Sequence, residues 1–362
     1  MSKSSKIRVG LVGAGEWARN GHVPALREVP EFELVAVATS RPVTAREAAA
    51  RFAIPHACSD ATELIGRDDV DLVVVNNRAP DHLAVTRAAL DAGKHVYCEW
   101  PLTTRLADSE QLLASAERAG VRHVVGLQRR MAGSSRHLRE LIAEGYVGTV
   151  RSVHLHVTEP TFAQRRASVL GFTIPGENFS SVFSIYGGHY LDLILTAVGG
   201  LDAFSSVVTS QFPWVTLTES GENVESTAPD QMLLSGTLAR GGVISAHVEG
   251  GKRSGYGVRI DITGADGDLR LTYDQAFGAT HDGELAGARH GQGSLVALPI
   301  PERLQWLSSS NLRGSVRELG NLYAAFARDM IDGTQHTPSF HDAVRLHALL
   351  DAIESRSLSP SR

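Results

Sequence analysis

Residues 13–18 form a glycine-rich segment, GAGEWA, whose spacing suits the binding of a phosphate group. The segment directly follows an apolar run at 7–12 and opens a predicted helix. In such a segment the first glycine forms a tight turn, and the second lets the backbone approach a pyrophosphate. The helix amides then face the phosphates, and an alanine in third place still allows close helix–strand packing. We therefore predict a dinucleotide site that includes Gly13, Gly15, Glu16 and Trp17.

About 20 residues farther on, the segment Ala38-Thr39-Ser40-Arg41-Pro42 indicates which cofactor is preferred. An acidic residue here would accept hydrogen bonds from the ribose hydroxyls of NAD, but the segment has no carboxylate. Ser40 and Arg41 can instead hold a 2′-phosphate, with the guanidinium acting as a charged fork. A surface arginine beside a helix start is the structural alternative. We expect NADP(H) to be preferred, with NAD(H) as the second option.

The segment Gly187-Gly188-His189-Tyr190-Leu191-Asp192 combines residues suited to proton transfer. A histidine whose pKa lies near its ordinary value of about 6.5 can accept a hydroxyl proton while hydride leaves the same carbon. His189 is therefore a candidate acid/base and substrate contact, although a lone histidine can equally be structural. Asp192 lies three residues farther on the same helical face and is expected to orient or charge-stabilise the ring. Tyr186 is a second candidate proton donor.

Polar and aromatic residues also follow other apolar runs, at the edge of a parallel sheet where ligands bind. Trp100 can present a flat face to the ligand or seal a domain interface, and His82 can contact the cofactor or cap a helix. The arginines after 122–126 suit a substrate hydroxyl or carboxylate, or an interdomain ion pair. The further cofactor contacts expected here are Asn76, Arg78, His82, Trp100 and Gln128. The expected substrate contacts are Trp100, Arg130, His189 and Lys252.

We expect no metal site. His154 and His156 lie two residues apart on one face of a predicted strand, but no carboxylate or cysteine partner is evident for them. Alternation in a half-exposed strand accounts for the pair. Cys58 and Cys98 have no C-x-x-C spacing, and Cys98 is expected to be a buried small residue rather than a nucleophile.

Alternating strands and helices must position the residues of the first 130 positions. Segments of helical period separate short continuous apolar runs, which predicts a doubly wound parallel sheet covered on both faces. Asp81 is a candidate N-cap, and Gly93 a candidate residue just past the end of the same helix. The apolar runs lie at 7–12, 32–38, 71–75, 95–97 and 122–126, and the helical segments at 42–52, 81–92 and 103–119.

After about residue 150 the pattern changes to two-residue alternation with glycine-rich turns, which predicts an antiparallel sheet of hairpins. We predict a Rossmann domain over residues 1–130 and an α+β domain with a mostly antiparallel open sheet over 131–362, whose closing helices can pack back on the first domain. The alternating runs lie at 153–157, 203–212, 231–238, 242–249 and 257–263. The helical segments of this part lie at 188–198, 315–332 and 340–354.

Length and composition limit the class of protein. A chain of 362 residues that is 43% hydrophobic, with a net charge of -5, fits a soluble protein of two domains. The absence of a basic block argues against nucleic-acid binding. No run reaches the roughly 18 apolar residues of a membrane helix, and no signal-peptide core precedes the first strand. Two cysteines form no disulfide framework. We expect a cytoplasmic protein.

Segments along nearly the whole chain resemble the Gfo/Idh/MocA oxidoreductase family. They are GAGEWA, AGKHVYCEWPL at 92–102, GLQRR at 126–130, GYVGTV at 145–150, GGHYLDL at 187–193 and FHDAVRLHALLDAIE at 340–354. The resemblance implies a nucleotide domain joined to a domain whose open sheet often makes oligomer contacts, hence a homo-oligomer (dimer or tetramer). It also implies chemistry on sugars, polyols or related compounds with NAD or NADP, and it places Glu99 at the nicotinamide ribose.

Two departures from the family pattern bear on catalysis. Where the family has Glu-Lys-Pro, with the lysine near nicotinamide and substrate, this chain has Glu99-Trp100-Pro101. Where the family has an aspartate four residues before the histidine, this chain has Ile185. The Glu-Trp-Pro variant, with RAPDH at 78–82 and TAPDQ at 227–231, is similar to the subgroup of the fungal galactose-pathway co-repressor and its bacterial relatives. The fungal protein binds dinucleotide but works as a regulator.

Two functions remain open. The leading hypothesis is an NAD(P)-dependent oxidoreductase that transfers hydride between nicotinamide and a sugar, a polyol or a related polar hydroxyl or carbonyl compound. The alternative is a catalytically silent dinucleotide-binding regulator that acts through protein partners.

Overall fold

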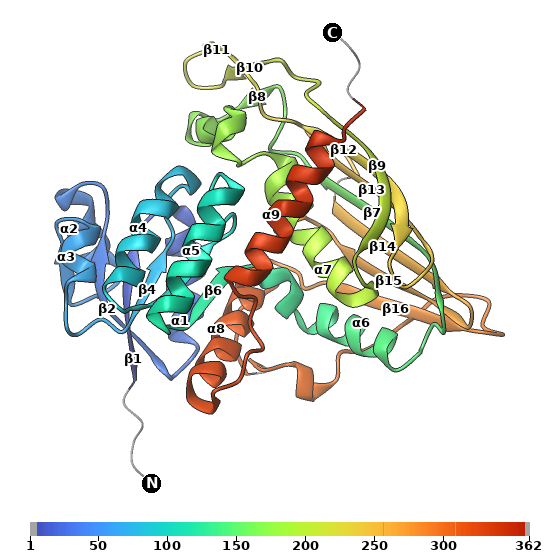
Figure 1. Ribbon diagram of the computed structural model, residues 1–362, viewed down its shortest axis with the longest axis horizontal. Coiled ribbons are helices and arrows are strands. Elements are labelled where there is room, and N and C mark those ends of the chain that lie inside the picture. The colour runs from blue at the N-terminus through green and yellow to red at the C-terminus, as the bar shows by residue number, and fades with distance from the viewer. Residues whose placement is uncertain (1–5, 256, 308, 359–362) are drawn as a thin grey trace. The chain divides into compact units, whose positions relative to one another are not determined.

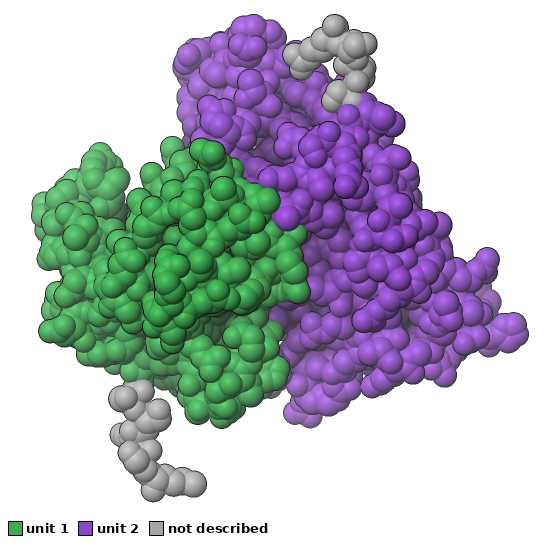
Figure 2. Space-filling view, in the orientation of Figure 1, with its two compact units in different colours: residues 1–128, 307–312, 316–345 green, residues 129–306, 313–315, 346–362 purple. Residues whose placement is uncertain are grey.

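A computed structural model describes residues 6–255, 257–307 and 309–358. The chain divides into two compact units (Figure 2). The first comprises residues 1–128, 307–312 and 316–345, and the second comprises 129–306, 313–315 and 346–362.

A six-stranded parallel sheet forms the centre of the first unit (Figure 1). Its strand order, β3-β2-β1-β4-β5-β6, is that of dinucleotide-binding doubly wound folds, and the order reverses between β1 and β4. All four residues of β4 are completely buried, as expected for a parallel strand covered on both faces. The strands are β1 (Ile7–Val12), β2 (Phe32–Ala38), β3 (His56–Cys58), β4 (Leu72–Val75), β5 (His95–Glu99) and β6 (His123–Gly126). The prediction of a Rossmann-type sheet is confirmed.

The helices between these strands largely follow the predicted segments. They are α1 (Val23–Arg27), α2 (Pro42–Arg51), α3 (Ala61–Ile65), α4 (Ala79–Asp91) and α5 (Leu106–Ala119). Asp81 as an N-cap is wrong, because α4 begins at Ala79, with Arg78 in the N-cap position and Pro80 in its first turn. Gly93 lies just past the C-cap Ala92 with a φ of 68°, as predicted. The short strand β3 had no counterpart in the predicted pattern.

An eight-stranded, mostly antiparallel sheet forms the centre of the second unit, in the order β17-β16-β15-β14-β7-β13-β12-β9. Its one parallel pair is β13 with β7. The strands are β7 (Val150–Glu159), β9 (Leu201–Thr209), β12 (Gln231–Leu238), β13 (Val243–Gly250), β14 (Gly257–Gly264), β15 (Gly267–Tyr273), β16 (Glu284–Arg289) and β17 (Val296–Ala297). A small sheet contains β8 (Arg165–Arg166), β10 (Trp214–Leu217) and β11 (Asn223–Glu225). The predicted α+β fold is confirmed.

The two faces of the large sheet differ in burial. Residues of β13 alternate, so that Ile244, Ala246 and Val248 are buried while the residues between them are more exposed. The π-helical turn η5 (Phe183–Gly187), α6 (Gly133–Ala143) and α7 (Gly188–Val198) pack on the buried side, which we call the inner face (Figure 1). The opposite, outer face carries exposed apolar side chains such as Leu233 and Val243.

The chain closes with α8 (Gly314–Asp332) and α9 (Phe340–Ser355). Within the first unit, Tyr323 of α8 stacks on Tyr97 of β5, with ring centroids 5.1 Å apart. In the part of the chain that the structure describes, no helix is long and apolar enough to cross a membrane. A second π-helical turn, η1 (Ala18–His22), follows the glycine segment, and 3₁₀ turns are η2 (Gln128–Met131), η3 (Ser168–Thr173), η4 (Gly176–Asn178) and η6 (Glu302–Leu304).

Candidate functional site

The glycine turn has the geometry that a dinucleotide site requires. Gly13 has a φ of 100°, and a Cβ atom there would lie 2.4 Å from the carbonyl oxygen of Asn76, so only glycine fits. A Cβ at Gly15 would meet nothing within 4 Å, which leaves open space beside the backbone. Helical backbone begins at Glu16. The turn therefore exposes amide groups at the start of a helix, as phosphate binding requires.

Two buried amide side chains near the same sheet edge also fit a bound ligand. Asn77 follows β4 and Gln128 follows β6, and the side-chain oxygen of each is buried with no hydrogen-bond partner among the described residues. Buried polar atoms are normally satisfied, so these two acceptors suit a hydrogen-bonding ligand. The residues of the first unit therefore fit a nicotinamide dinucleotide. Gln128 as a cofactor contact stays a prediction, and Asn77 is an addition that sequence reasoning missed.

The residues expected to select the cofactor lie between β2 and α2. Arg41 and Ser40 are exposed, and Arg41 occupies the N-cap position of α2. The hydroxyl of Thr39 lies 2.6 Å from that of Thr44 and donates to the carbonyl of Arg41 at 2.8 Å, which fixes the local backbone. Among the described residues, no acceptor pairs with the Arg41 guanidinium, which leaves its donors available. The 2′-phosphate role of Arg41 and Ser40 stays a prediction.

Glu99 is held by a buried aromatic network within the first unit. Its Oε1 accepts a hydrogen bond from the Tyr97 hydroxyl at 2.8 Å and lies 3.0 Å from Nε2 of His22. The other ring nitrogen of His22 lies 2.7 Å from the Tyr323 hydroxyl. The His22 ring thus lies between the Glu99 carboxylate and the Tyr323 hydroxyl. Sequence reasoning missed His22, which lies in the π-helical turn η1, a helix type frequent at functional sites.

Burial changes the interpretation of two other residues at this edge. His82 is buried, and both of its ring nitrogens face backbone carbonyls, at 2.8 Å from Pro101 and 3.0 Å from Asn77. Burial lowers the pKa of His82. Its ring links two loops through these carbonyls, and a contact of His82 with a cofactor stays a prediction. Trp100 is only 4% exposed, which fits both a pocket wall and an interface seal. Arg78 stays a prediction.

His189 is buried at the start of α7 in the second unit. It is 3% exposed, its Nδ1 has no hydrogen-bond partner in the described part of the chain, and its ring packs edge-on against Phe277 at 4.7 Å. Burial, together with the nearby Arg129 guanidinium, lowers its pKa to about 3. The expectation of an ordinary pKa is therefore wrong. The ring is neutral at physiological pH, so it can accept a proton but is not a protonated general acid.

Tyr186 lies in the π-helical turn η5, is half-buried, and pairs with the buried carboxyl group of Glu159. Burial first, and then the charge of Glu159, raise the pKa of Tyr186. Glu159 ends β7, is 7% exposed, and has its own pKa raised by burial. Its Oε1 accepts from the Thr161 hydroxyl at 2.8 Å and from the Thr161 amide at 3.1 Å. Buried groups with perturbed pKa values cluster at functional sites, and sequence reasoning missed Glu159. The position of an acid at a strand's carboxyl end was the available signal.

The structure assigns Asp192 a partner other than His189. The Arg130 guanidinium donates to the Asp192 carboxylate with two nitrogens, one of them at 2.7 Å. Asp192 does not contribute to the pKa shift of His189. The orienting role expected for Asp192 is therefore not supported, and Arg130 is engaged in this ion pair rather than available for a substrate. A three-residue helical spacing allows contact but does not decide which neighbour a carboxylate binds.

Arg129 lies buried within an aromatic cluster of the second unit. Its guanidinium carbon lies 4.4 Å from the ring centre of Phe277, 4.8 Å from that of Tyr273 and 5.6 Å from that of Tyr190. Its side chain also donates to the carbonyl of Ala276. The positive charge next to His189 therefore has a fixed position.

Lys252 is not brought to His189. Its ammonium donates to Oε1 of Glu249 at 3.1 Å, on the outer face of the large sheet, whereas η5 and α7 pack on the inner face. Gly187 confirms this side, because a Cβ there would meet Val248 and Met232 of the inner face. Strand alternation puts the ion-pair partner of Lys252 on the face opposite to η5 and α7, and a substrate contact by Lys252 stays a prediction.

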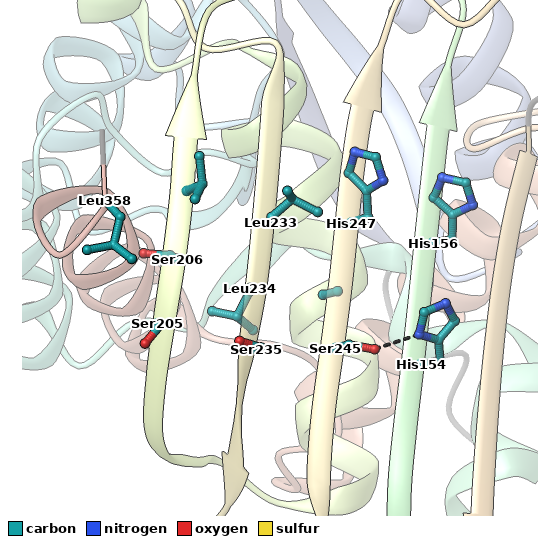
Figure 3. Close-up of a pocket in the computed structure, with 12 residues that line it drawn as sticks. His154, His156, Ser205, Ser206, Leu233, Leu234, Ser235, Ser245, His247 and Leu358 are labelled. Atoms are coloured by element: carbon teal, nitrogen blue, oxygen red, sulfur yellow. Dashed lines mark hydrogen bonds between the residues drawn. The ribbon is translucent and has the colours of Figure 1, made fainter. Parts of the chain in front are cut away.

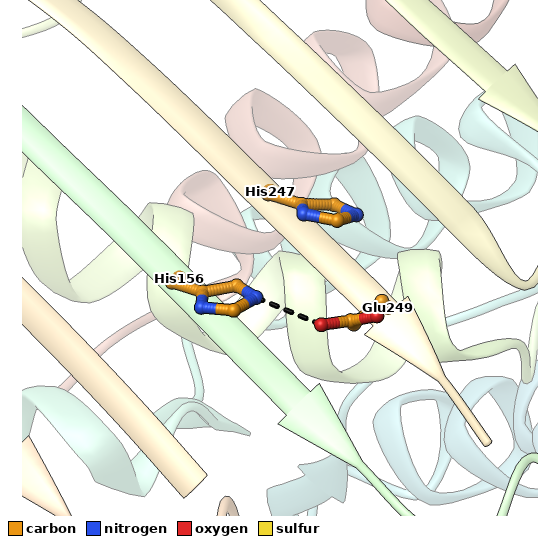
Figure 4. A group of neighbouring side chains, drawn as sticks. All are labelled: His156, His247 and Glu249. Atoms are coloured by element: carbon orange, nitrogen blue, oxygen red, sulfur yellow. Dashed lines mark hydrogen bonds and ion pairs between the residues drawn. The ribbon is translucent and has the colours of Figure 1, made fainter. Parts of the chain in front are cut away.

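The outer face also brings together a group that sequence reasoning discounted. His156 lies 2.9 Å from Glu249 and stacks against His247 at 5.2 Å (Figure 4). The expectation that His156 has no carboxylate partner is wrong, because the partner comes from a strand 93 positions away in sequence. His154 points to the same face and bonds Ser245 instead (Figure 3).

A shallow concavity of about 580 Å³ lies on this outer face (Figure 3). Serines and histidines line part of it, and apolar side chains line the rest. Its lining includes His154, His156, Ser205, Leu233, His247 and Leu358. It lies on the other side of the sheet from η5 and α7, so it is distinct from the surroundings of His189.

The fold and the glycine turn define a dinucleotide-binding α/β protein with a second, α+β unit. Residues 7–127 match the model described as the oxidoreductase family with an NAD-binding Rossmann fold, and residues 135–273 match the model of the Gal80p C-terminal domain. These stretches together make up more than half of the chain. The N-terminal part of the chain is therefore of the Gfo/Idh/MocA oxidoreductase type, and its C-terminal part is of the Gal80p type.

Relatives of this chain include both an enzyme and a regulator. The chain is 29% identical over 248 residues to the dehydrogenase aclE of Aspergillus oryzae, covering 65% of this chain and 68% of the relative. It is 25% identical over 307 residues to the galactose/lactose metabolism regulatory protein GAL80 of Saccharomyces cerevisiae, covering 76% and 68%. A structure of levoglucosan dehydrogenase with NADH and levoglucosan shares the fold, with a TM-score of 0.83 at 20% identity over 98% and 97% of the chains.

Proposed function

We propose that the protein is an NAD(P)-dependent oxidoreductase acting on a hydroxyl or carbonyl group of a sugar, a polyol or a related polar compound. The observation that carries the proposal is His189, a buried neutral imidazole whose Nδ1 has no partner in the described structure. A buried acceptor of this kind suits a ligand that supplies the missing hydrogen bond. The dehydrogenase relative and the levoglucosan complex with NADH support this class of chemistry.

The bound nicotinamide would supply the hydride chemistry, and the chain's own groups would bind and move the proton. The turn at Gly13 and Gly15 would hold the pyrophosphate, and the buried side-chain oxygens of Asn77 and Gln128 would accept hydrogen bonds from other parts of the dinucleotide. In the oxidative direction a substrate hydroxyl can donate to neutral His189. Because a base with a pKa of about 3 holds a proton weakly, we propose that the pair Tyr186–Glu159, with a raised carboxyl pKa, takes part in proton transfer.

The proposal includes NADP(H) as the preferred cofactor, supported by the unpaired Arg41 donors and the lack of a carboxylate after β2. It also includes a cytoplasmic location and a homo-oligomeric state. The exposed apolar side chains Leu233 and Val243 are one observation that supports the oligomer. Light scattering on the purified chain measures the oligomeric state. A mass equal to one chain would contradict that part of the proposal.

The second candidate function is a catalytically silent, dinucleotide-binding regulator. Trp100 and Ile185 replace the two polar groups that typical members of the family use, and the GAL80 relative is a regulatory protein. Purified protein with NADPH or NADP⁺ and a panel of sugars, polyols and ketoses separates the two functions. Turnover that disappears in His189→Ala supports the enzyme. Cofactor binding without turnover of any panel member supports the regulator.

A further inference from the structure

Three potential metal-ligand side chains gather on the outer face of the large sheet (Figure 4). His156 belongs to β7, and His247 lies directly opposite it on the parallel neighbour β13. Glu249 is two residues farther along β13 and therefore on the same face. One side-chain ligand atom from each residue lies within 4.8 Å of the other two. The backbone register of two strands thus fixes three potential ligands next to one another.

We propose that His156, His247 and Glu249 bind one divalent transition-metal ion of the zinc class. Two imidazole nitrogens and one carboxylate oxygen form the His₂Glu donor set that zinc accepts, with water in the fourth position. Imidazole donors favour zinc, copper and nickel over magnesium and calcium, which prefer all-oxygen sites. The donor types therefore select the metal class.

The present geometry requires only side-chain movement to close around an ion. Ligands about 2.1 Å from a tetrahedral ion lie ~3.4 Å from one another. His156 Nε2 and Glu249 Oε1, now 2.9 Å apart, would separate slightly, and His247 would approach by on the order of 1 Å. Rotations about side-chain bonds supply such shifts without moving the strands. The two rings are stacked with an interplanar angle of 15°, so both present their edges to the same region beside Glu249.

Two neighbouring groups compete with the ion. Nε2 of His247 lies 3.0 Å from Oε1 of Gln231, and the ammonium of Lys252 lies 3.1 Å from Oε1 of Glu249. Each contact occupies a ligand atom that the metal would use. The side chain of Lys252 is 33% exposed and long, so it can turn into solvent when a cation binds. Removing its charge should therefore strengthen metal binding.

The proposed site is independent of the proposed oxidoreductase function. Its three residues lie on the sheet face opposite to η5 and α7, whereas the glycine turn lies in the first unit. His156 and His247 also line the shallow concavity, which leaves room for a water molecule or a small ligand beside the ion (Figure 3). A metal at this place would not depend on hydride transfer.

A calorimetric titration of the full-length, chelator-treated protein with Zn²⁺ tests the proposal. We expect one ion to bind per chain. Co²⁺ should bind at the same place and give the visible absorption of a tetrahedral complex. Zinc stoichiometry near zero, or a cobalt spectrum without those bands, would overturn the assignment.

Variants then identify the ligands. His156→Ala and His247→Ala should each weaken Zn²⁺ binding by about 100-fold or more, since losing even an outer-shell partner commonly costs 10–100-fold. Glu249→Gln should weaken binding to the same extent. Because it keeps the side chain's size, it serves as the test if the alanine variants fold poorly. Lys252→Met should tighten binding.

The matched control is His154→Ala, on the same strand and face but bonded to Ser245. It should bind Zn²⁺ as the unchanged protein does. A loss in His154→Ala equal to that in His156→Ala, or no loss in Glu249→Gln, would refute the three-ligand site.

Discussion

Nε2 of His22 lies 3.0 Å from Oε1 of Glu99, and the Tyr323 hydroxyl fixes the opposite side of the same ring at 2.7 Å. The relationship links the π-helical turn after the glycine segment to the carboxyl end of β5 and to α8. Glu99, which the family resemblance places at the nicotinamide ribose, is thus contacted by a histidine that lies outside the glycine segment.

His22→Ala should therefore weaken cofactor binding and lower stability. Deleting the ring leaves the Tyr323 hydroxyl and one side of Glu99 without partners, which costs about 1–3 kcal/mol in unfolding free energy. Fluorescence titration with NADPH and chemical denaturation measure both effects. Tyr323→Phe, which keeps the ring in front of Glu99, should show the smaller loss of NADPH affinity. Unchanged affinity in His22→Ala would contradict the positioning role.

Arg41 is predicted to distinguish the two cofactors. If its guanidinium holds the 2′-phosphate, Arg41→Ala should weaken NADPH binding by about 1.5–3 kcal/mol, the range for hydrogen bonds to charged groups. NADH binding should hardly change. Arg46→Ala, an exposed arginine one turn farther along α2, is the control and should bind both cofactors normally. Equal losses for both cofactors in Arg41→Ala would refute the assignment.

Burial of neutral His189 predicts acid sensitivity of the fold. Its folded pKa of about 3 lies below the unfolded value of about 6.5, so below pH 6.5 the unfolded chain binds a proton that the folded ring does not. Stability should thus decrease as pH falls, by about 2 kcal/mol between pH 8 and pH 5 from this group.

Denaturation midpoints of His189→Gln across this pH range test the effect, because the variant should lose that share of the pH dependence. His154→Gln, at an exposed position, should keep it. A His189→Gln variant with an unchanged slope would show that the ring is not buried in its neutral form.

Glu159 and Tyr186 are predicted to act together in proton transfer. Glu159→Gln should lower kcat by about 10²–10⁴-fold, the usual contribution of a positioned acid or base, with a smaller effect on KM. Tyr186→Phe should behave similarly, and the double variant should be little worse than either single one. Glu249→Gln on the outer face should leave kcat unchanged. Additive losses in the double variant would contradict a shared role.

Trp100→Lys alone is expected to restore no activity. Trp100 is 4% exposed, so a lysine there would be a buried unpaired charge, and Ile185 leaves the family's partner carboxylate absent. Pairing the change with Ile185→Asp is the informative comparison. Steady-state rates with NADP⁺ measure both variants. A large gain from Trp100→Lys alone would show that the missing lysine by itself limits catalysis.

Local pattern determined much of the architecture. The continuous apolar runs of β1, β2 and β4 and the alternation of β12 and β13 predicted the two sheet types, because burial on one or both faces directly sets the apolar period. The glycine turn was likewise readable, since Gly13 must adopt a positive φ against Asn76. A three-residue strand such as β3 is too short for its apolar pattern to be recognised.

Tertiary structure alone decided which side chains meet. The sequence by itself determined the local spacings from which His189, Asp192 and Lys252 were predicted as site residues and His156 was considered as a metal ligand. The fold pairs Asp192 with Arg130, and it pairs Glu249 with both Lys252 and His156. It also buries His189, which lowers the pKa of that ring to about 3. These outcomes depend on strand register and on burial among residues distant in sequence. Local spacing carries no information about either, because both are set by how the whole sheet packs.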